Sequence, residues 1–286
     1  MIYDLIVLGA GPAGLSAAIT ARGRNKQVLV VGNRWQDSPL ARAKRIDNYL
    51  GLPSCTGAEL LTQFQRHAEE AGVDFVTGRV ISLIEWEGFA LTVGSDVYQG
   101  KALILAPGVV RQTKYPGEET YLGRGVSYCA TCDGLLYRGK SVAVVGRSKD
   151  APREAAYLNS LGCQVVYVAP RQPEDLDPAI PFVKAAHVTV QGEEMVTGLG
   201  VNDDTLPVNG VFILRDALAP TDLLPDLELR NGAIAVDREM ATSLPGVFAA
   251  GDCTGGPLQV AKAVGEGHTA GLSAAEYVDR KRNEHQ

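Results

Sequence analysis

Gly9-Ala10-Gly11-Pro12-Ala13-Gly14 decides the fold of this chain, because it places the pattern G-x-G-x-x-G between a strand and a helix. The apolar run from Ile2 to Leu8 precedes it and predicts a strand that is buried on both faces. A helix is expected from about Pro12 to Arg22, and a second strand from Val28 to Val31. This order of strand, helix and strand is the β-α-β unit of a nucleotide-binding domain.

The three glycines of this turn have separate tasks in such a unit. Gly9 permits the tight turn, Gly11 lets the backbone approach a pyrophosphate, and Gly14 lets helix and strand pack closely. The start of the helix then presents free N–H groups to the phosphates. The alternative interpretation is a strand-to-helix turn that binds no ligand. The second strand ends at Gly32-Asn33, where an acidic residue usually holds a ribose, so a contact there would come from the asparagine.

A second β-α-β unit follows later in the chain. It consists of a strand from Ser141 to Val145, a helix from about Pro152 to Leu161, and a strand from Val165 to Ala169. The spacing from the glycine after the first strand to the next strand is the same in both units. The sequence therefore predicts an α/β protein with two nucleotide-binding-type, Rossmann-like domains.

The first of these domains is expected to be discontinuous. Lys101 to Leu105 and Thr242 to Ala250 are predicted strands, and a helix is predicted from about Gln259 to Tyr277. We therefore expect residues 1–108 and 242–286 to form one domain around an inserted domain of residues 109–241.

Composition excludes several classes of function. The chain has 286 residues, of which 45% are hydrophobic and 21% charged, as in a globular protein of one large or two medium domains. A net charge of −6 argues against nucleic acid as a partner. Apolar stretches are only strand-sized, so no membrane span is expected. No signal peptide precedes the first strand, and five cysteines in such a chain favour the reducing cytoplasm.

Cys129-Ala130-Thr131-Cys132-Asp133 carries the chemistry of the inserted domain. Two cysteines at this spacing can close a small disulfide and exchange two electrons, and a helix start stabilises their thiolates. The alternatives are a pair of inert core thiols and a zinc half-site, which would need two further ligands. The remaining cysteines have no partner at a useful spacing and are expected to be packing residues: Cys55, Cys163 and Cys253.

Four strings of the sequence occur together, in this order, in one enzyme family. They are Gly9–Gly14, Ala106-Pro107-Gly108, Cys129–Asp133 and the string Thr-Ser-Leu-Pro-Gly-Val-Phe-Ala-Ala-Gly-Asp at 242–252. Through these motifs the whole chain resembles the low-molecular-weight thioredoxin reductases. The resemblance implies an enzyme that uses FAD, reduces thioredoxin and forms a homodimer.

The resemblance also assigns residues to roles. Cys129 and Cys132 would be the redox pair, with Asp133 as proton donor to the dithiol. Cys132 is expected to lie nearer the flavin and Cys129 to be more accessible. Asn48, Gln259 and Val260 would lie beside the flavin ring. The full set of residues assigned to FAD is Gly9, Gly11, Pro12, Ala13, Gly14, Gly32, Asn33, Asn48, Ala106, Gly108, Gly251, Asp252, Gln259 and Val260.

The second β-α-β unit departs from the family where NADPH would bind. Gly146, Ser148 and Ala151 stand at the positions of the family's G-x-G-x-x-A, and the serine side chain obstructs a pyrophosphate. The family's His-Arg-Arg cluster is replaced by Ala169-Pro170-Arg171-Gln172-Pro173-Glu174-Asp175, in which acid follows a single arginine. The segment from Leu206 to Pro225 also lacks the family's usual string.

These losses resemble the ferredoxin-dependent flavin thioredoxin reductases of anaerobic bacteria, so ferredoxin is the expected electron donor. Two alternatives stay open. The same reaction could use NADPH or NADH through a divergent loop, with Glu174 or Asp175 holding the ribose of NADH. The chain could also be a non-catalytic flavin or dithiol redox sensor.

Two surfaces are expected to receive protein partners. Arg124 and Leu135-Leu136 flank the dithiol at positions that resemble the family's thioredoxin contacts. Ferredoxins are generally acidic, and a run of basic residues before Asn48 would steer them to the flavin. This run comprises Arg34, Arg42, Lys44 and Arg45. Ordinary packing of the leucines and a chance run of charge are the other interpretations.

Overall fold

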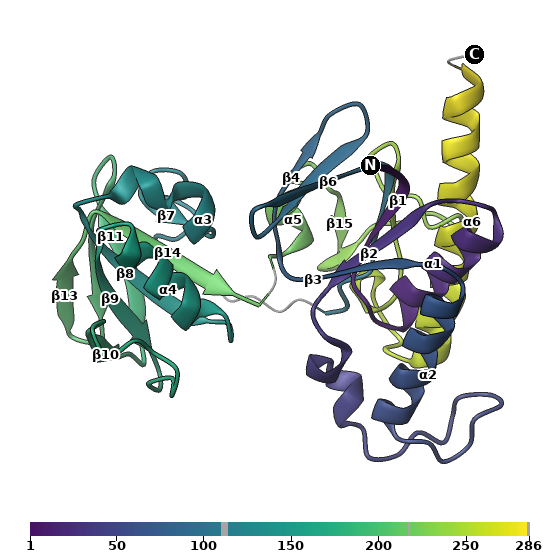
Figure 1. The fold of residues 1–286 in the computed structure, drawn as a ribbon, viewed down its shortest axis with the longest axis horizontal. Helices are drawn as coiled ribbons and strands as arrows, with labels where there is room; N and C mark the ends of the chain where they lie inside the picture. Colours follow the sequence, from purple (N-terminus) through teal and green to yellow (C-terminus); the bar gives the residue numbers. More distant parts are fainter. Residues whose placement is uncertain (110–113, 217, 285–286) are drawn as a thin grey trace. The chain divides into compact units, whose positions relative to one another are not determined.

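The chain forms two compact units, each of which is described by itself (Figure 1). The computed structural model of the protein describes residues 1–109, 114–216 and 218–284. Unit 1 comprises Met1–Arg111 and Leu218–Gln286, and unit 2 comprises Gln112–Ala217. The chain therefore returns to unit 1 well before residue 242, where the sequence places the second crossing.

The segment 218–241 accounts for this difference. It contains the short helix α5 (Pro220–Leu223) and the antiparallel pair β15 (Leu229–Arg230) and β16 (Ala233–Ile234). The side chain of Ile234 is buried in the core of unit 1. These elements are too short to produce a hydrophobic period, so the sequence does not reveal that they belong to unit 1.

Unit 1 is built on a seven-stranded sheet. Its strands are β1 (Ile2–Leu8), β2 (Val28–Gly32), β3 (Asp74–Thr77), β4 (Val80–Glu85), β5 (Phe89–Val93), β6 (Asp96–Leu105) and β17 (Val247–Ala249). The order is β3-β2-β1-β6-β5-β4, with β17 also paired to β6. Strand β1 is parallel to both of its neighbours, and its residues Leu5, Ile6 and Val7 are fully buried, as the apolar run predicts.

Helices cover one face of this sheet. They are α1 (Pro12–Gly23), α2 (Gly57–Glu70) and α6 (Val260–Glu284), accompanied by the short turns η1 (Trp35–Asp37), η2 (Pro39–Arg42) and η4 (Asp252–Thr254). Leu5 and Val7 pack with α1 and α6, whereas Ile6 and Leu8 belong to the core on the other face. This alternation follows from the period of two along a strand.

Unit 2 repeats the parallel architecture on a smaller scale. Its strands are β7 (Val126–Ser127), β8 (Ser141–Arg147), β9 (Gln164–Ala169), β10 (Phe182–Lys184) and β14 (Gly210–Arg215), in the order β10-β9-β8-β14-β7. An antiparallel sheet adds β11 (Val188–Gly192), β12 (Val196–Val201) and β13 (Asp204–Pro207). The helical segments are α3 (Ala130–Asp133), η3 (Gly134–Tyr137) and α4 (Ala151–Ser160). Both predicted β-α-β units are therefore confirmed.

One predicted strand is wrong over most of its length. Of the stretch from Thr242 to Ala250, only the three residues of β17 form a strand. The hydroxyl of Thr242 donates to the carbonyl oxygen of Val247 at 2.9 Å, and Gly246 has a φ of +77°, so the first half closes a turn. Among the described residues, no helix has the length and apolar character needed to cross a membrane.

Unit 2 contains a buried ion pair that joins distant parts of its sequence. The guanidinium of Arg215, at the end of β14, donates to both carboxylate oxygens of Glu118 at 2.7 Å. The Tyr115 N–H and the Tyr128 hydroxyl each donate to the same carboxylate at 2.8 Å. Burial by itself would raise the pKa of Glu118, but these hydrogen bonds and the charge of Arg215 lower it below its ordinary value.

We predict that Glu118→Gln destabilises unit 2 at neutral pH by about 3–5 kcal/mol, because Arg215 loses its buried counter-charge. The lowered pKa means that the ion pair contributes above the unfolded pKa of about 4.3 and is lost as pH falls through the folded value. The difference between the variant and the parent protein should therefore stay constant from pH 7 to about pH 5 and shrink as pH falls from about 5 to about 3. Hydrogen exchange at the amides of β8 and β14 measures this difference in the free energy of unfolding.

The neighbouring exposed residue provides a control for this prediction. Glu119→Gln should change the stability of unit 2 by no more than about 0.5 kcal/mol at any pH in this range. A stability difference for Glu118→Gln that stays constant between about pH 5 and about pH 3 would contradict the proposed linkage.

Candidate active site

Gly9 and Gly14 bring the end of β1, the start of α1 and the end of β6 into direct contact. A Cβ atom on Gly14 would lie 1.9 Å from the carbonyl oxygen of Gly9, and one on Gly9 would lie 2.1 Å from that of Ala106. Gly9 also has a φ of +121°, which side chains rarely permit. The turn therefore excludes any side chain at these two positions.

Gly11 is different, because a Cβ atom there would meet no protein atom within 4 Å. It is the N-cap residue of α1, and Pro12 follows in the first turn. Gly251 approaches this turn from the C-terminal part of the chain, where its Cβ atom would lie 2.8 Å from that of Ala13. The open space beside the N-terminal N–H groups of α1 fits a pyrophosphate.

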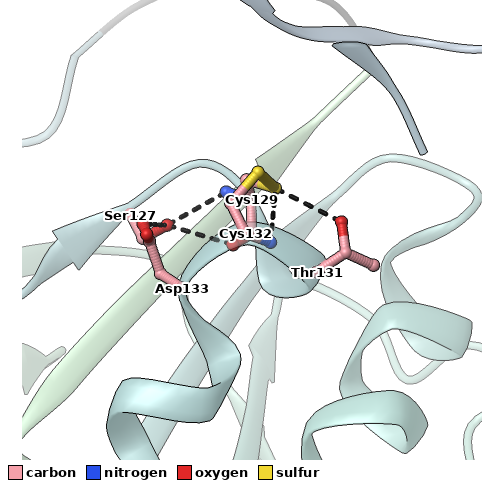
Figure 2. The surroundings of a disulfide bond; sticks show 5 residues. All are labelled: Ser127, Cys129, Thr131, Cys132 and Asp133. Carbon is pink, nitrogen blue, oxygen red and sulfur yellow. Dashed lines mark hydrogen bonds between the residues drawn. A yellow bond between two sulfur atoms is a disulfide. The ribbon is translucent and has the colours of Figure 1, made fainter. Parts of the chain in front are cut away.

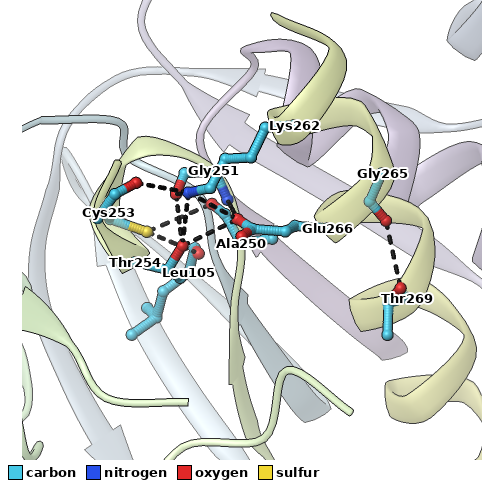
Figure 3. A network of polar contacts seen from close by, with 10 residues as sticks. Leu105, Ala250, Gly251, Cys253, Thr254, Lys262, Gly265, Glu266 and Thr269 are labelled. Carbon is cyan, nitrogen blue, oxygen red and sulfur yellow. Dashed lines mark hydrogen bonds and ion pairs between the residues drawn. The ribbon is translucent and has the colours of Figure 1, made fainter. Parts of the chain in front are cut away.

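A polar network holds the loop after β17 against α6 (Figure 3). The ammonium of Lys262 donates to the carbonyl oxygens of Gly251 at 2.8 Å and Gly255 at 2.6 Å, and to the Thr254 hydroxyl at 2.9 Å. It also pairs with Glu266 at 3.0 Å. Glu266 accepts from the N–H of Gly251 and the hydroxyl of Thr254, both at 2.8 Å.

This network fixes Asp252, the first residue of η4. Burial raises the pKa of Asp252 above its ordinary value, the charge of Lys262 opposes the rise, and Glu266 adds to it. The sequence analysis assigned Asp252 to the site but missed Lys262 and Glu266. The sequence did contain a signal for this ion pair, since opposite charges four residues apart on a helix commonly pair.

The end of β2 lies against the glycine turn. A Cβ atom on Gly32 would lie 2.9 Å from the backbone nitrogen of Ala10. A cavity of about 230 Å³ opens here, lined by Asn33, Trp35 and Thr77 among others. It borders the ends of β1 and β2, the place where parallel α/β domains take the nucleoside end of a dinucleotide.

The remaining predicted cofactor contacts lie at the surface of unit 1. Asn48 is exposed on the loop between η2 and α2, and Gly108 is half-buried after β6 with a φ of +71°. Gln259 precedes α6, and its backbone carbonyl oxygen accepts the Ala263 N–H at 3.0 Å. Val260 begins that helix. The roles of these four residues beside a flavin remain predictions.

Cys129 and Cys132 form a disulfide bond across the single turn of α3, with Cα atoms 5.3 Å apart (Figure 2). Cys129 is the N-cap residue of α3, and its Sγ accepts the N–H of Cys132 at 2.9 Å. The Thr131 hydroxyl lies 3.3 Å from the same sulfur. Hydrogen bonds of this kind stabilise a thiolate when the disulfide opens.

Ser127 connects the dithiol to the predicted proton donor. Its hydroxyl donates to the Asp133 carboxylate at 2.6 Å and accepts the N–H of Cys129 at 3.1 Å (Figure 2). Asp133 therefore belongs to a hydrogen-bond network that reaches the backbone of Cys129, and its role as proton donor stays a prediction. The sequence analysis missed Ser127, because a lone serine on a short strand carries no signal.

The accessibility of the two cysteines is the reverse of the expectation. Cys129 is 6% exposed, at the end of the buried strand β7, whereas the α3 turn places Cys132 at the surface. The expectation that Cys129 is the more accessible sulfur is therefore wrong. Leu135 and Leu136 are 61% and 68% exposed and Arg124 is exposed, as a docking surface beside the dithiol requires.

The strand ends of unit 2 are covered by its own side chains. The ring centre of Tyr115 lies 5.5 Å from the guanidinium carbon of Arg147, the last residue of β8, and 5.4 Å from that of Arg215. Arg147 also donates to the Tyr115 hydroxyl. Strands β8 and β14 are parallel neighbours, so Tyr115 stands between the two carboxyl ends where such sheets bind ligands.

The loop that would hold a pyrophosphate in unit 2 is altered in the same region. A Cβ atom on Gly146 would lie 1.9 Å from the hydroxyl of Tyr167, so this glycine makes room for a tyrosine. Tyr167 is 1% exposed, and burial raises its pKa to about 12, assisted by Asp175. The Ser148 hydroxyl is buried and, within the described part of the chain, has no hydrogen-bond partner.

Other potential ligands do not gather into a site. In the described residues, no three His, Cys, Asp or Glu side chains could together hold a metal ion. Cys163 and Cys253 are buried free thiols, and Cys55 is half-buried. Burial raises the pKa of Cys253 to about 12, so its thiol stays protonated beside Asp252.

Known proteins agree with this arrangement. Residues 3–267 match the family model described as pyridine nucleotide-disulphide oxidoreductase. The thioredoxin reductase of Aquifex aeolicus is 34% identical, over 98% of this chain and 95% of its own length. Two structures of a ferredoxin-flavin thioredoxin reductase from Clostridium acetobutylicum are also similar. One is 41% identical with a TM-score of 0.86, covering 96% of this chain and 97% of its own. The other is 38% identical with a TM-score of 0.88, covering 99% of both chains.

The chain therefore belongs to the pyridine nucleotide-disulphide oxidoreductase family, and to the thioredoxin reductases within it. It is a flavoprotein disulfide oxidoreductase that binds FAD. The open space at Gly11, the turn closed by Gly9 and Gly14 and the adjoining cavity fit this cofactor.

We predict that Gly11→Val yields a folded but colourless protein. The valine Cβ meets no protein atom within 4 Å, so its side chain would clash only with the pyrophosphate. The parent protein should purify yellow, with about one FAD per chain by absorbance. Gly23→Val is the matched control, because the space around Gly23 at the other end of α1 is equally open. Full FAD content in Gly11→Val would contradict the assignment.

Proposed function

We propose that this protein reduces thioredoxin with electrons that it receives from reduced ferredoxin rather than from a pyridine nucleotide. The two Clostridium acetobutylicum structures support this proposal, because they are described as ferredoxin-flavin thioredoxin reductases and match nearly the whole chain. The five cysteines and the family resemblance further lead us to propose that it acts in the cytoplasm as a homodimer.

The observation that carries the proposal is the covered crevice of unit 2. A pyridine nucleotide would have to enter between the carboxyl ends of β8 and β14, which is where Tyr115 lies between Arg147 and Arg215. Displacing these groups would disturb the Arg215–Glu118 ion pair, whose carboxylate is fully buried. Breaking such a pair leaves an uncompensated buried charge and is costly.

The two domains have different roles because their glycine turns differ. We propose that residues 1–108 and the C-terminal segment hold FAD through the glycine turn, Gly32, Asn33 and Asp252. The inserted part would carry the dithiol and no nucleotide. Open space at Gly11 of unit 1, against the close contact of Gly146 with Tyr167 in unit 2, supports this division.

The energetics permit this electron flow. Low-potential ferredoxins lie near −400 mV and thioredoxin near −270 mV, so two electrons release about 6 kcal/mol. Ferredoxin delivers single electrons, whereas a disulfide takes two. Bound FAD would supply the chemistry that connects them, because a flavin can hold one or two electrons. The chain itself then needs only to hold the cofactor and to present a disulfide that can be reduced.

The geometry of the dithiol suggests how thioredoxin is reduced. Two electrons and two protons open the Cys129–Cys132 bond. The exposed Cys132 thiolate then attacks the thioredoxin disulfide, forming a mixed disulfide and releasing one thioredoxin thiolate. Cys129 attacks that bond through its own sulfur, restores the internal disulfide and releases the second thiolate. Asp133, which Ser127 holds by a hydrogen bond, would donate a proton to the dithiol.

An exposed basic run is the proposed entry for ferredoxin. Arg42 and Lys44 are exposed, whereas Arg34 and Arg45 pair with Asp37 and Asp47 at the surface. An acidic protein would be attracted to this run although the whole chain carries −6. This loop lies in unit 1, in the part of the chain that contains Asn48.

The donor is tested by anaerobic turnover of thioredoxin with three reductants: reduced ferredoxin, NADPH and NADH. We expect turnover with ferredoxin alone, at a rate that falls with added salt, since screening shortens to about 8 Å near physiological ionic strength. Arg42→Glu with Lys44→Glu should slow it, and Arg230→Glu, an exposed arginine elsewhere in unit 1, should not. Turnover with NADPH would overturn the donor assignment. Dithiol reduction without thioredoxin turnover would indicate a redox sensor.

The attacking cysteine is tested by trapping. The trap is a thioredoxin whose resolving cysteine is replaced by serine and whose remaining cysteine carries 5-thio-2-nitrobenzoate as leaving group. We expect the reduced Cys129→Ser variant to accumulate a mixed disulfide with it, because the exposed Cys132 attacks, thionitrobenzoate leaves and neither protein holds a second thiol that resolves the bond. Cys132→Ser should form much less of it, since Cys129 is 6% exposed. Both variants should keep FAD. Mass spectrometry that locates the bond at Cys129 would show that the buried sulfur attacks.

A further inference from the structure

Tyr128 links the dithiol to the buried ion pair of unit 2. It directly precedes Cys129 and is 8% exposed. Its hydroxyl donates to the Glu118 carboxylate at 2.8 Å, and the ammonium of Lys114 donates to the same hydroxyl at 3.2 Å. The side chain next to the redox cysteine is therefore anchored at its far end inside the protein.

The anchor is itself buried and fully hydrogen-bonded. Glu118 is fully buried, and four donors hold it, two from the Arg215 guanidinium and one each from the Tyr115 N–H and Tyr128. Arg215 ends β14, a central strand of the unit 2 sheet. Through Glu118 and Arg215, the Tyr128 hydroxyl is therefore held at a fixed position relative to the sheet.

A short edge strand leads to the dithiol. Strand β7 has only two residues and lies at the edge of its sheet, paired with Val211 and Phe212 of β14. Ser127 holds the backbone of Cys129 and the Asp133 carboxylate. Successive side chains of an extended segment point to opposite sides, so Ser127 and Tyr128 hold it from two directions.

We propose that Tyr128 and Glu118 are positioning residues for the dithiol, which hold Cys129 in the geometry that thiol–disulfide exchange requires. In this proposal both residues act through the backbone position of Cys129 and take no part in the exchange itself. The inference depends on the dithiol–thioredoxin half of the proposed function and is independent of the electron donor.

A purely structural role of the ion pair makes a different prediction. In that case, removal of the Tyr128 hydroxyl would lower stability a little and leave the chemistry of the dithiol unchanged. Tyr128→Phe separates the two roles, because it keeps the ring and the Arg215–Glu118 pair and removes only the hydroxyl, with its hydrogen bonds to Glu118 and Lys114. Tyr121→Phe is the matched control. It removes another tyrosine hydroxyl of unit 2, which donates to the Gly192 carbonyl away from the dithiol.

The experiment uses FAD-loaded protein whose dithiol has been reduced with dithiothreitol, followed by removal of the reductant. Oxidised thioredoxin is then added, and its single-turnover reduction is followed by tryptophan fluorescence. We expect Tyr128→Phe to slow this step about fivefold, the ratio that one hydrogen bond commonly supplies. Tyr121→Phe should react at the parent rate. Melting temperature and FAD content confirm that both variants are folded.

A second measurement does not need thioredoxin. The rate at which iodoacetamide alkylates the reduced protein, measured from pH 5 to 9, reports the thiolate titration. We expect Tyr128→Phe to shift this profile and Tyr121→Phe to leave it unchanged. Parent-like exchange rates and profiles in Tyr128→Phe would overturn the inference, as would equal changes in both variants. If the parent protein failed to reduce thioredoxin, the proposed function would fail, and the alkylation profiles would still decide the role of Tyr128.

Discussion

The close contact between the first turn of α1 and α6 at Gly267 sets the position of the whole cofactor site. A Cβ atom on Gly267 of α6 would lie 2.1 Å from the Ala13 carbonyl oxygen, and one on Gly251 would lie 2.8 Å from the Ala13 Cβ. Backbones can approach so closely only where side chains are absent. Asp252 therefore comes to lie beside the glycine turn, although the two are at opposite ends of the sequence.

Unit 2 uses the same architecture for another purpose. Its parallel strands end as those of unit 1 do, but Tyr115 and the Arg215–Glu118 pair occupy the space between the ends of β8 and β14. The pair then supports Tyr128 and the dithiol. In our proposals one feature, the buried ion pair at the strand ends, accounts for both the closed crevice and the fixed redox segment.

Local patterns were sufficient to predict the two β-α-β units, the glycine turn and the dithiol, because each depends on residues that are close in sequence. Long-range contacts were not predictable in this way. Glu118 and Arg215 are 97 residues apart, and no spacing connects them. The relative exposure of Cys129 and Cys132 depends on how the α3 turn leaves a buried strand, which composition does not encode. The turn at Gly246 shortened a predicted strand for a similar reason, since Thr242 hydrogen-bonds within the loop.

The central claim is that the crevice of unit 2 is closed to pyridine nucleotides by its own side chains. Isothermal titration of NADPH into the FAD-loaded protein under anaerobic conditions tests this claim most directly. The covered strand ends predict no saturable heat up to about 1 mM nucleotide, which corresponds to less than about 4 kcal/mol of binding free energy. Saturable binding of one NADPH per chain with a dissociation constant near 1 μM, about 8 kcal/mol, would contradict it.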